Sequence, residues 1–310
     1  MKAIVYTKYG GPGVLEMRDI EKPVPGSNEL LVKVEASSVS SGVTWLRKGK
    51  YPGSLLFTVL LRLMYGILKP RNPVLGVEFA GIVEQVGDNV TAFRPGDKVY
   101  GTTTGLKNGA YAEYICIPEI RKQGVFSKLP EQLSMKEAAA IPVGGLTAIF
   151  LLNKVGIETG QKILIYGASG SVGTSAIQVA KYACAKVTAV CSKANFSLVA
   201  ALGAEHTIDY RREDISLLKE RYDIVFDAVG KLPGSVGRRL LKKGGRFCTV
   251  RSMTEEKMEN LQFLNQMIEQ GEFNPVIDRV YRLDQIVEAH QYVDLGHKRG
   301  NVVLQHGFLI

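Results

Sequence analysis

The stretch KILIYGASGSVG, Lys162 to Gly173, decides the fold of this chain. Ile163, Leu164 and Ile165 form a short apolar run without helical periodicity, as expected of a strand buried on both faces of a parallel sheet. A glycine-rich turn follows, and the residues from Val172 to Tyr182 have the amphipathic spacing of a helix. The order of strand, glycine turn and helix predicts a nucleotide-binding unit.

The glycines of this turn, Gly167, Gly170 and Gly173, stand three residues apart. They let the backbone bend sharply and bring its N–H groups, with the N-terminus of the helix behind them, against a pyrophosphate. Glycine triplets also occur in purely structural turns, so the flanking elements decide between the two interpretations. A second strand, Lys186 to Val190, completes a βαβ unit of the length that a dinucleotide site needs, which favours nucleotide binding.

Length and composition describe a globular protein of two domains. The chain has 310 residues, of which 45% are hydrophobic, enough for substantial cores. The N-terminus lacks the charged start and apolar run of a signal peptide, and charges recur too often for a transmembrane span. We therefore expect a cytoplasmic protein without a membrane partner.

The cysteines and the net charge give no support to a disulfide-rich or metal-binding protein or to a nucleic-acid-binding protein. The four cysteines lie far apart and share no metal-ligand spacing, so free thiols are expected rather than disulfides. The net charge is +9, but the basic residues are scattered along the chain. A nucleic-acid partner is therefore disfavoured, and the charge is interpreted as solvated surface that also attracts an anionic cofactor.

The elements on either side of the nucleotide unit differ in character. Residues 1 to 120 alternate strands with glycine and proline turns, which predicts a mostly β domain. From Ser134, which forms a capping-box pattern with Glu137, helices alternate with strands as in a doubly wound sheet. A final strand, Asn301 to Leu304, is expected to pair back with the first domain. We place that discontinuous domain at 1–122 and 271–310, and the nucleotide-binding domain at 123–270.

The segment LLFTVLLRLMYGIL, Leu55 to Leu68, is unusually apolar. It contains Arg62 and is too short to span a bilayer. We predict a helix that is buried in the core. The alternative is that its aromatic residues Phe57 and Tyr65 line the mouth of a substrate site.

The end of the second strand of the βαβ unit indicates the cofactor. Sites for NAD usually place Asp or Glu there, about 20 residues past the glycines, because a carboxylate accepts hydrogen bonds from the ribose hydroxyls. The stretch from Thr174 to Ala204 contains no acidic residue, and Ser192 and Lys193 follow the strand. A hydroxyl and a cation suit the 2′-phosphate of NADPH, which is therefore the expected cofactor.

The order of motifs resembles the medium-chain dehydrogenase/reductase superfamily and, within it, the zinc-independent quinone oxidoreductases related to zeta-crystallin. The resemblance covers nearly the whole chain. It rests on the glycine turn and on LGVEFAGIVEQVG (75–87), RPGDKVYG (94–101), GAYAEY (109–114), AAAIPVGGLTA (138–148), LGAEHTIDY (202–210), FDAVG (226–230) and GHKRGNVVL (296–304). It implies an α/β fold in which a Rossmann domain, with a doubly wound parallel sheet, is inserted in a mostly β GroES-like catalytic domain. The cofactor would lie in the cleft between them.

The resemblance also assigns cofactor contacts to individual residues. The pyrophosphate would lie on the turn after Gly167, at Ser169, Gly170, Ser171, Val172 and Gly173. The 2′-phosphate would lie near Ser192, Lys193 and Tyr210, and the nicotinamide half near Thr147, Val229 and Asn301. Thr147 and Asn301 also have structural interpretations, as a helix-turn hydroxyl and as a turn that leads into a strand.

Departures from the family pattern shape the expected chemistry. Zinc-bearing relatives have ligands where this chain has Ser40, Ser41 and Val77, so no zinc is expected. Zinc-less relatives often have an Asp at the place of Val43. The stretch after Val250 is too short for the outer strand by which relatives dimerise, so the oligomeric state stays open and an unusual assembly is predicted.

These observations predict an NADPH-dependent, zinc-free oxidoreductase that transfers hydride to quinones. Without a metal or an obvious general acid, the acceptor must disperse the negative charge itself, as quinones and conjugated enones do. The alternatives are reduction of the C=C bond of enals or enones and, from a different class, a non-catalytic NADPH-binding protein with a redox-sensing or RNA-binding role. We take Ser40 as a candidate donor to the acceptor oxygen, and Tyr51 and Tyr65 as candidate walls. The physiological substrate is left open.

Overall fold

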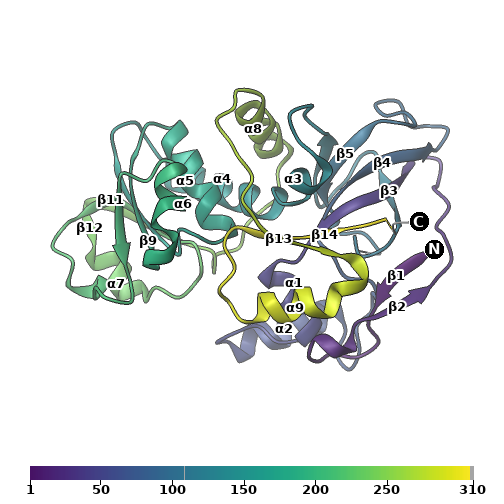
Figure 1. Cartoon of the computed structure of the whole chain (residues 1–310), viewed down its shortest axis with the longest axis horizontal. Coiled ribbons are helices and arrows are strands. Elements are labelled where there is room, and N and C mark those ends of the chain that lie inside the picture. Colours follow the sequence, from purple (N-terminus) through teal and green to yellow (C-terminus); the bar gives the residue numbers. More distant parts are fainter. Residues whose placement is uncertain (108, 308–310) are drawn as a thin grey trace. The chain divides into compact units, whose positions relative to one another are not determined.

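The computed structural model describes residues 1–107 and 109–307. The chain divides into two compact units, unit 1 (Met1–Pro142 and Ile277–Ile310) and unit 2 (Val143–Val276). Figure 1 shows purple and yellow segments, from the two ends of the chain, side by side in unit 1. The expected fold class, a parallel Rossmann-type sheet inserted in a mostly β domain, is confirmed.

Unit 1 is built on a seven-stranded sheet in the order β13-β14-β3-β4-β5-β7, with β6 also paired to β3. Its strands are β3 (Glu29–Ser38), β4 (Glu78–Val86), β5 (Lys98–Thr102), β6 (Tyr114–Pro118), β7 (Phe126–Lys128), β13 (Ile277–Arg282) and β14 (Asn301–Gln305). As predicted, the last strand returns to the first domain, because β14 pairs antiparallel with β3. A separate sheet joins β1 (Lys2–Val5) to β2 (Glu16–Asp19).

Two apolar cores hold unit 1 together. Its helices are α1 (Ser41–Lys48), α2 (Leu55–Tyr65), α3 (Met135–Ala139) and α9 (Ile286–Asp294). In one core α1 and α9 pack with β1 and β14. The other lies on the inner face of β3, where alternate residues Leu30, Val32 and Val34 point the same way, as the two-residue period of a strand requires.

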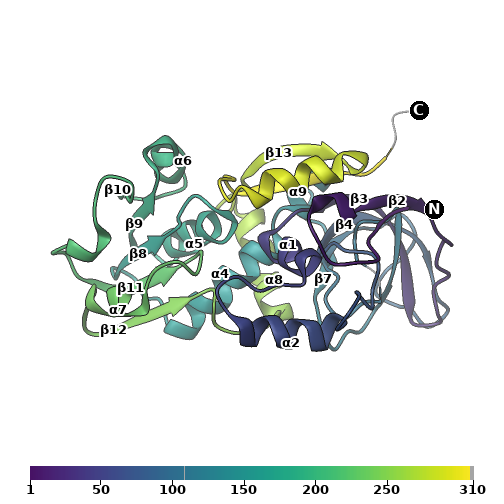
Figure 2. The same cartoon turned by 90° about the horizontal axis from the view of Figure 1, so that it is seen from below.

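Unit 2 contains a five-stranded parallel sheet in the order β10-β9-β8-β11-β12. Its elements are β8 (Lys162–Tyr166), β9 (Lys186–Cys191), β10 (His206–Asp209), β11 (Tyr222–Asp227) and β12 (Leu241–Thr249), with α4 (Pro142–Val155), α5 (Ser171–Tyr182), α6 (Phe196–Ala201), α7 (Gly234–Arg239) and α8 (Met258–Glu269). Figure 2 shows β8 between β9 and β11. The strand order reverses at β8, and ligands of such sheets bind at that switch point.

The boundaries of the units differ from those expected. Residues 123–142 belong to unit 1, because β7 pairs with β5 and α3 packs against β3, β4 and β5. Residues 271–276 belong to unit 2, where the Asn274 N–H donates to the side chain of Gln178 in α5. The predicted capping box of Ser134 and Glu137 is present. Residues 123–142 and 271–276 thus belong to the units with which they form hydrogen bonds and packing contacts, and the sequence motifs alone did not indicate this.

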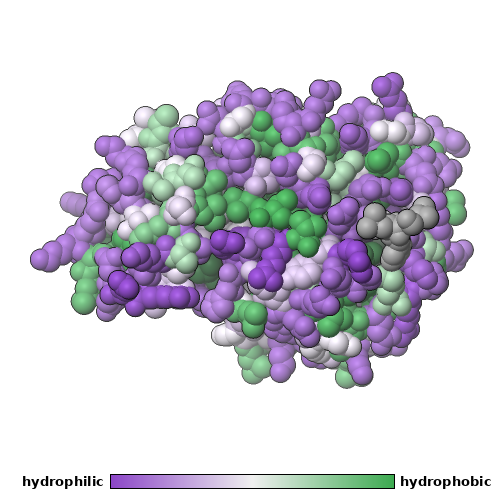
Figure 3. Space-filling view, viewed as in Figure 1, coloured by the Kyte–Doolittle hydropathy of each residue, from purple (hydrophilic) through white to green (hydrophobic). Residues whose placement is uncertain are grey.

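The apolar stretch after α1 does form a helix, α2, but the predicted burial in the core is wrong, since no residue of α2 is buried. The polar side chains of α2 face the protein: Thr58 Oγ1 donates to the Tyr51 carbonyl, and Arg62 Nε donates to the Gly49 carbonyl. The apolar side chains are thereby turned outward, and Figure 3 shows green side chains at the lower rim, where Figure 1 draws α2. Among the described residues, no helix has the length and apolarity to cross a membrane.

Candidate functional site

The turn between β8 and α5 has the geometry of a phosphate-binding loop. Gly167 has a φ of +78°, and a Cβ on Gly173 would come within 2.3 Å of the Gly167 carbonyl oxygen, so both positions require glycine. A Cβ on Gly170 would meet nothing closer than 3.6 Å, which leaves that part of the turn open. No described side chain caps α5 at Gly170, and the first N–H groups of the helix are therefore donors for a bound anion.

Asn195 links this turn to the end of β9. Its Nδ2 donates to Ser169 Oγ at 2.9 Å and to Ser192 Oγ at 3.2 Å. Two serines that are distant in sequence are thereby brought together, and Lys193 is exposed beside them. The sequence interpretation missed Asn195; its one signal was an amide side chain three positions after Ser192.

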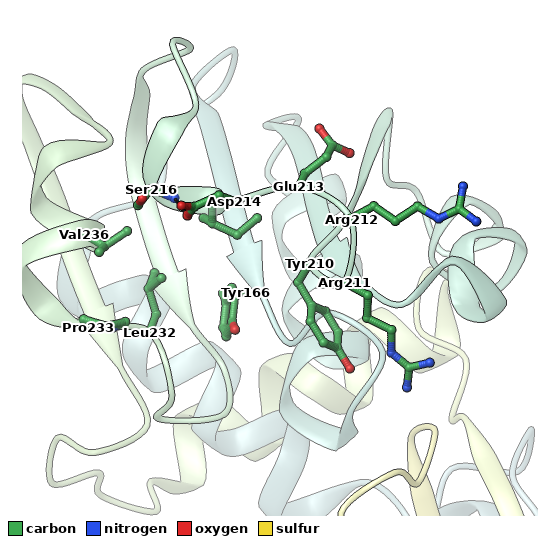
Figure 4. A pocket seen from close by; sticks show the side chains of 11 residues that line it. Tyr166, Tyr210, Arg211, Arg212, Glu213, Asp214, Ser216, Leu232, Pro233 and Val236 are labelled. Carbon is green, nitrogen blue, oxygen red and sulfur yellow. Dashed lines mark hydrogen bonds between the residues drawn. The ribbon is translucent and has the colours of Figure 1, made fainter.

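Tyr210 lines a pocket at the carboxyl edge of the same sheet (Figure 4). The cavity measures about 470 Å³ and is lined by Tyr166, Tyr210, Arg211, Arg212, Glu213, Asp214, Ile215, Ser216, Leu232, Pro233 and Val236. The rings of Tyr166 and Tyr210 have centroids 6.5 Å apart, and the Arg211 guanidinium lies 5.9 Å from the centre of the Tyr210 ring. Figure 4 shows the Arg211 and Arg212 side chains extending away from Leu232 and Pro233. Aromatic and guanidinium groups in this arrangement can hold a flat base and an anion.

Two of the residues assigned to the nicotinamide half lie in unit 2. Thr147 is half-buried in α4, and Val229 follows β11, with its side chain against Gly167. Asp227 fixes this loop, since it accepts hydrogen bonds from the Val229 and Leu232 N–H groups and from Thr249 Oγ1.

The third of these residues and the three candidate catalytic residues belong to unit 1. Asn301 is buried at the start of β14. Ser40 caps α1, with its Oγ accepting from the Val43 N–H at 3.4 Å. Tyr65 is the last residue of α2, and Tyr51 precedes this helix. The Tyr51 ring contacts the rings of Trp45 and Phe57, at centroid distances of 5.1 and 5.2 Å.

A buried polar cluster lies at the end of the unit 1 sheet, next to Ser40. Ser38 Oγ donates to the Glu78 carboxylate, and the Tyr111 hydroxyl donates to the Ser38 carbonyl at 3.0 Å. The side chains of Ser38 and Glu78 come from the end of β3 and the start of β4, and both residues are 1% exposed. Nothing in the sequence indicated this cluster, because its members are adjacent only through strand pairing.

Lys298 lies within the field of Glu78. Its Nζ donates to the Gly300 carbonyl at 2.5 Å. Burial lowers the pKa of Lys298 to about 8, while the carboxylates of Glu78 and Asp278 oppose this shift. A lysine with such a pKa can release a proton near neutral pH, which an exposed lysine does not readily do.

A buried ionic network braces unit 1 behind this cluster. Arg47 is fully buried, and its guanidinium donates to Asp294 Oδ2 at 2.5 Å and to His290 Nδ1 at 2.9 Å. These bonds join α1 to α9. Burial, with the charge of Arg47, lowers the pKa of His290 to about 3, so the ring is neutral and accepts at Nδ1. Burial likewise lowers the pKa of His306 to about 3; its Nε2 lies 2.8 Å from Ser37 Oγ.

The described residues contain no group of three or more His, Cys, Asp or Glu side chains placed to hold a metal ion. The four cysteines are free thiols. Burial raises the pKa of Cys191 to about 11 and that of Cys248 to about 12, so neither is a reactive thiolate at neutral pH. The absence of zinc remains a prediction.

Comparisons with known proteins match both units. Residues 26–130 match the alcohol dehydrogenase GroES-like domain, and residues 171–272 and 251–304 match zinc-binding dehydrogenase families. A quinone oxidoreductase of Lama guanicoe is 32% identical over 97% of this chain and 95% of its own. The chloroplastic NADPH-dependent alkenal/one oxidoreductase of Arabidopsis thaliana is 31% identical over 98% of this chain and 79% of its own. The solved quinone oxidoreductase from Coxiella burnetii has a TM-score of 0.85, at 30% identity and coverage of 98% and 99%.

Proposed function

Since this chain belongs to the medium-chain dehydrogenase/reductase superfamily, as a quinone oxidoreductase-like enzyme, we propose that it reduces quinones with NADPH. The observation that carries the cofactor assignment is the turn between β8 and α5. Its uncapped helix N-terminus and open Gly170 fit a pyrophosphate. When bound, NADPH supplies the hydride.

The choice of NADPH over NADH rests on the end of β9. Ser192 and Lys193 supply a hydroxyl and a cation for a 2′-phosphate, and Asn195 holds the Ser192 hydroxyl beside the glycine turn. The exposed Tyr210 and Arg211 add an aromatic face and a second cation at the pocket. The stretch at the end of β9 has no acidic residue of the kind that binds the ribose hydroxyls of NADH.

In this proposal, side chains of unit 1 stabilise and neutralise the negative charge that develops on the acceptor. We assign Ser40 Oγ as a hydrogen-bond donor to the acceptor oxygen and Lys298 as the source of the proton that neutralises it. Lys298 Nζ is fixed by its hydrogen bond to the Gly300 carbonyl and lies within the field of the Glu78 carboxylate, and Ser40 follows β3, which ends at Ser38 beside Glu78. Orientation of the acceptor and exclusion of water are the remaining tasks of the protein.

A titration of both reduced cofactors tests the cofactor assignment. We expect Lys193→Glu to weaken NADPH binding about tenfold or more, because charge-assisted hydrogen bonds contribute roughly 1.5 to 3 kcal/mol, and to affect NADH much less. The matched control is Lys186→Glu, which makes the same charge change on an exposed lysine at the other end of β9. Equal or tighter binding of NADH by the natural protein would refute the assignment.

Reduction of an enal or enone C=C bond is the second candidate, which the similarity to the alkenal/one oxidoreductase supports. Both reactions deliver hydride to a conjugated acceptor. Product analysis with stereospecifically deuterated NADPH separates them, since the deuterium is retained on carbon only in the enone product. Faster turnover of unconjugated ketones than of both acceptors would contradict both candidates, and unchanged rates in Ser40→Ala would exclude Ser40 from the reaction.

A further inference from the structure

Helix α2 presents its apolar side chains to solvent. In a helix on the surface of a globular protein the apolar stripe normally faces the core. In α2 the inner side carries Thr58 and Arg62, which are fixed by hydrogen bonds to the backbone of Tyr51 and Gly49, and the Arg62 guanidinium also lies 4.3 Å from the centre of the Tyr9 ring. The orientation of the helix is therefore set by specific contacts.

The outer side of α2 and the segment after it form a continuous exposed apolar surface, which we call the α2 face. More than half of the large hydrophobic side chains exposed among the described residues belong to it. They are Leu55, Leu56, Phe57, Val59, Leu60, Leu63, Met64, Tyr65, Ile67 and Leu68. Leu55 and Leu68, at its two ends, are 82% and 88% exposed. Contiguous apolar surface of this kind marks an interaction site.

The charged residues that flank α2 in the sequence are all cationic. No acidic residue occurs between Glu35 and Glu78, whereas the exposed Lys50, Lys69 and Arg71 flank the helix. A second copy of the chain would bring like charges against these cations, so pairing of two α2 faces is disfavoured. An apolar face whose flanking segments carry only cations matches a partner that is apolar inside and anionic at its surface.

We propose that the α2 face docks on an anionic lipid bilayer. An 11-residue helix is too short to span the hydrocarbon core, but it can lie in the interface plane with its apolar side in the headgroup and acyl boundary. Lys50, Lys69 and Arg71 then lie at the level of the anionic headgroups. A helix that lies in the interface needs no spanning segment, and it was the lack of such a segment from which no membrane partner was expected. Vesicle binding by the α2 face requires no bound cofactor.

Flotation with vesicles tests this inference. The full chain is mixed with vesicles of phosphatidylcholine alone, or of phosphatidylcholine with phosphatidylglycerol, and is centrifuged through a density gradient. We expect it to float with the anionic vesicles, and to float less as the salt concentration rises. Leu56→Glu should reduce the bound fraction by about tenfold, because a charge replaces an apolar side chain in the acyl boundary. The matched control is Leu295→Glu, since Leu56 and Leu295 in unit 1 are 68% and 67% exposed.

The single tryptophan of the chain gives a second readout. Trp45 contacts the Tyr51 ring, which contacts Phe57 in α2, so its fluorescence reports on the fold next to the α2 face. Without vesicles, an unchanged emission spectrum in Leu56→Glu shows that the variant is folded. With anionic vesicles that carry brominated acyl chains, emission of the natural protein should be quenched, and emission of Leu56→Glu should not.

Any of the following results would overturn the proposal. The first is failure of the natural protein to float with anionic vesicles. The second is equal flotation of folded Leu56→Glu and the natural protein, and equal flotation with neutral and anionic vesicles would count equally against it. The third is a dimer in light scattering that Leu56→Glu dissociates, without vesicle binding, which would make a second copy the occupant of the α2 face.

Discussion

The glycine turn of unit 2 and the polar end of the unit 1 sheet are built in opposite ways. The turn offers backbone N–H groups from one continuous segment, Gly167 to Gly173, and its shape depends on missing Cβ atoms. The polar end of unit 1 is made of side chains such as Ser38, Glu78 and Lys298, which come from three segments far apart in sequence. Binding of a ligand at the turn therefore depends on steric fit, whereas the properties of the polar end of unit 1 depend on charge and on proton binding.

The largest effect is expected from removal of Arg47, the buried cation of unit 1, which tests how far charged side chains hold this unit together. Arg47→Met should lower the free energy of unfolding by about 3 to 5 kcal/mol, because Asp294 and His290 lose their buried partner. Chemical denaturation measures the change. Arg18→Met removes an exposed ion pair with Glu16 and should cost less than about 1 kcal/mol. Equal losses in the two variants would show that the buried network does not stabilise unit 1.

The pH dependence of stability should also originate in unit 1. His290 and His306 have folded pKa values of about 3, below their usual value, so the unfolded chain binds protons first as the pH falls. Between pH 7 and pH 5 the free energy of unfolding should drop by roughly 2 kcal/mol for each histidine. Denaturation of His306→Asn across this range should show about half the slope, because only His290 then contributes. A natural protein equally stable at both pH values would contradict this account.

In the turn of unit 2, two glycine substitutions should separate folding from binding. The Cβ of Gly173→Ala meets backbone atoms, so this variant should lose about 1 to 3 kcal/mol of stability or more. The Cβ of Gly170→Ala comes no closer than 3.6 Å to the Gly167 carbonyl oxygen, so this variant should unfold like the natural protein. It should weaken NADPH binding, because the added methyl group would occupy the open part of the turn where we propose that the pyrophosphate binds. Thermal unfolding and cofactor titration give the two quantities. Equal destabilisation by both variants would mean that the turn is not open at Gly170.

The smallest expected effect concerns the proton assigned to Lys298. Turnover of the natural enzyme should decline above about pH 8 as Lys298 loses its proton. Lys298→Met should be about tenfold slower near neutral pH and should lose this decline, with an unchanged KM for NADPH. Lys298→Arg keeps the cation but does not release a proton in this range, so it should not restore the rate. An identical pH profile in all three proteins would exclude Lys298 as the proton source.

The sequence predicted the elements whose signals are local. The strand, turn and helix around Gly167 and the capping box at Ser134 are present because apolar runs, glycines and capping residues act within a few positions. Asn195 was missed because a side-chain bridge between two loops leaves no periodic pattern. The buried roles of Arg47 and Lys298 were missed because burial is decided by distant strands and helices.

The orientation of α2 shows a second limit of local signals. Its composition is that of a core helix, and hydropathy alone predicted burial. In the structure Thr58 and Arg62 form hydrogen bonds to the preceding loop, so the polar side of α2 faces the protein. Hydropathy does not encode such contacts.

Strand β12 ends the described sheet of unit 2 and leaves one edge of its backbone unpaired by a neighbouring strand. Such edges invite a strand from another molecule. This one carries Lys242, Lys243 and Arg246, of which the first is paired with Asp223 and the last donates to the Gly156 carbonyl. A second copy aligned along β12 would double the positive charge at the junction. Self-association through this edge should therefore be repelled in dilute buffer and should become easier only when salt screens the lysines, so that the ionic strength controls whether the molecules aggregate.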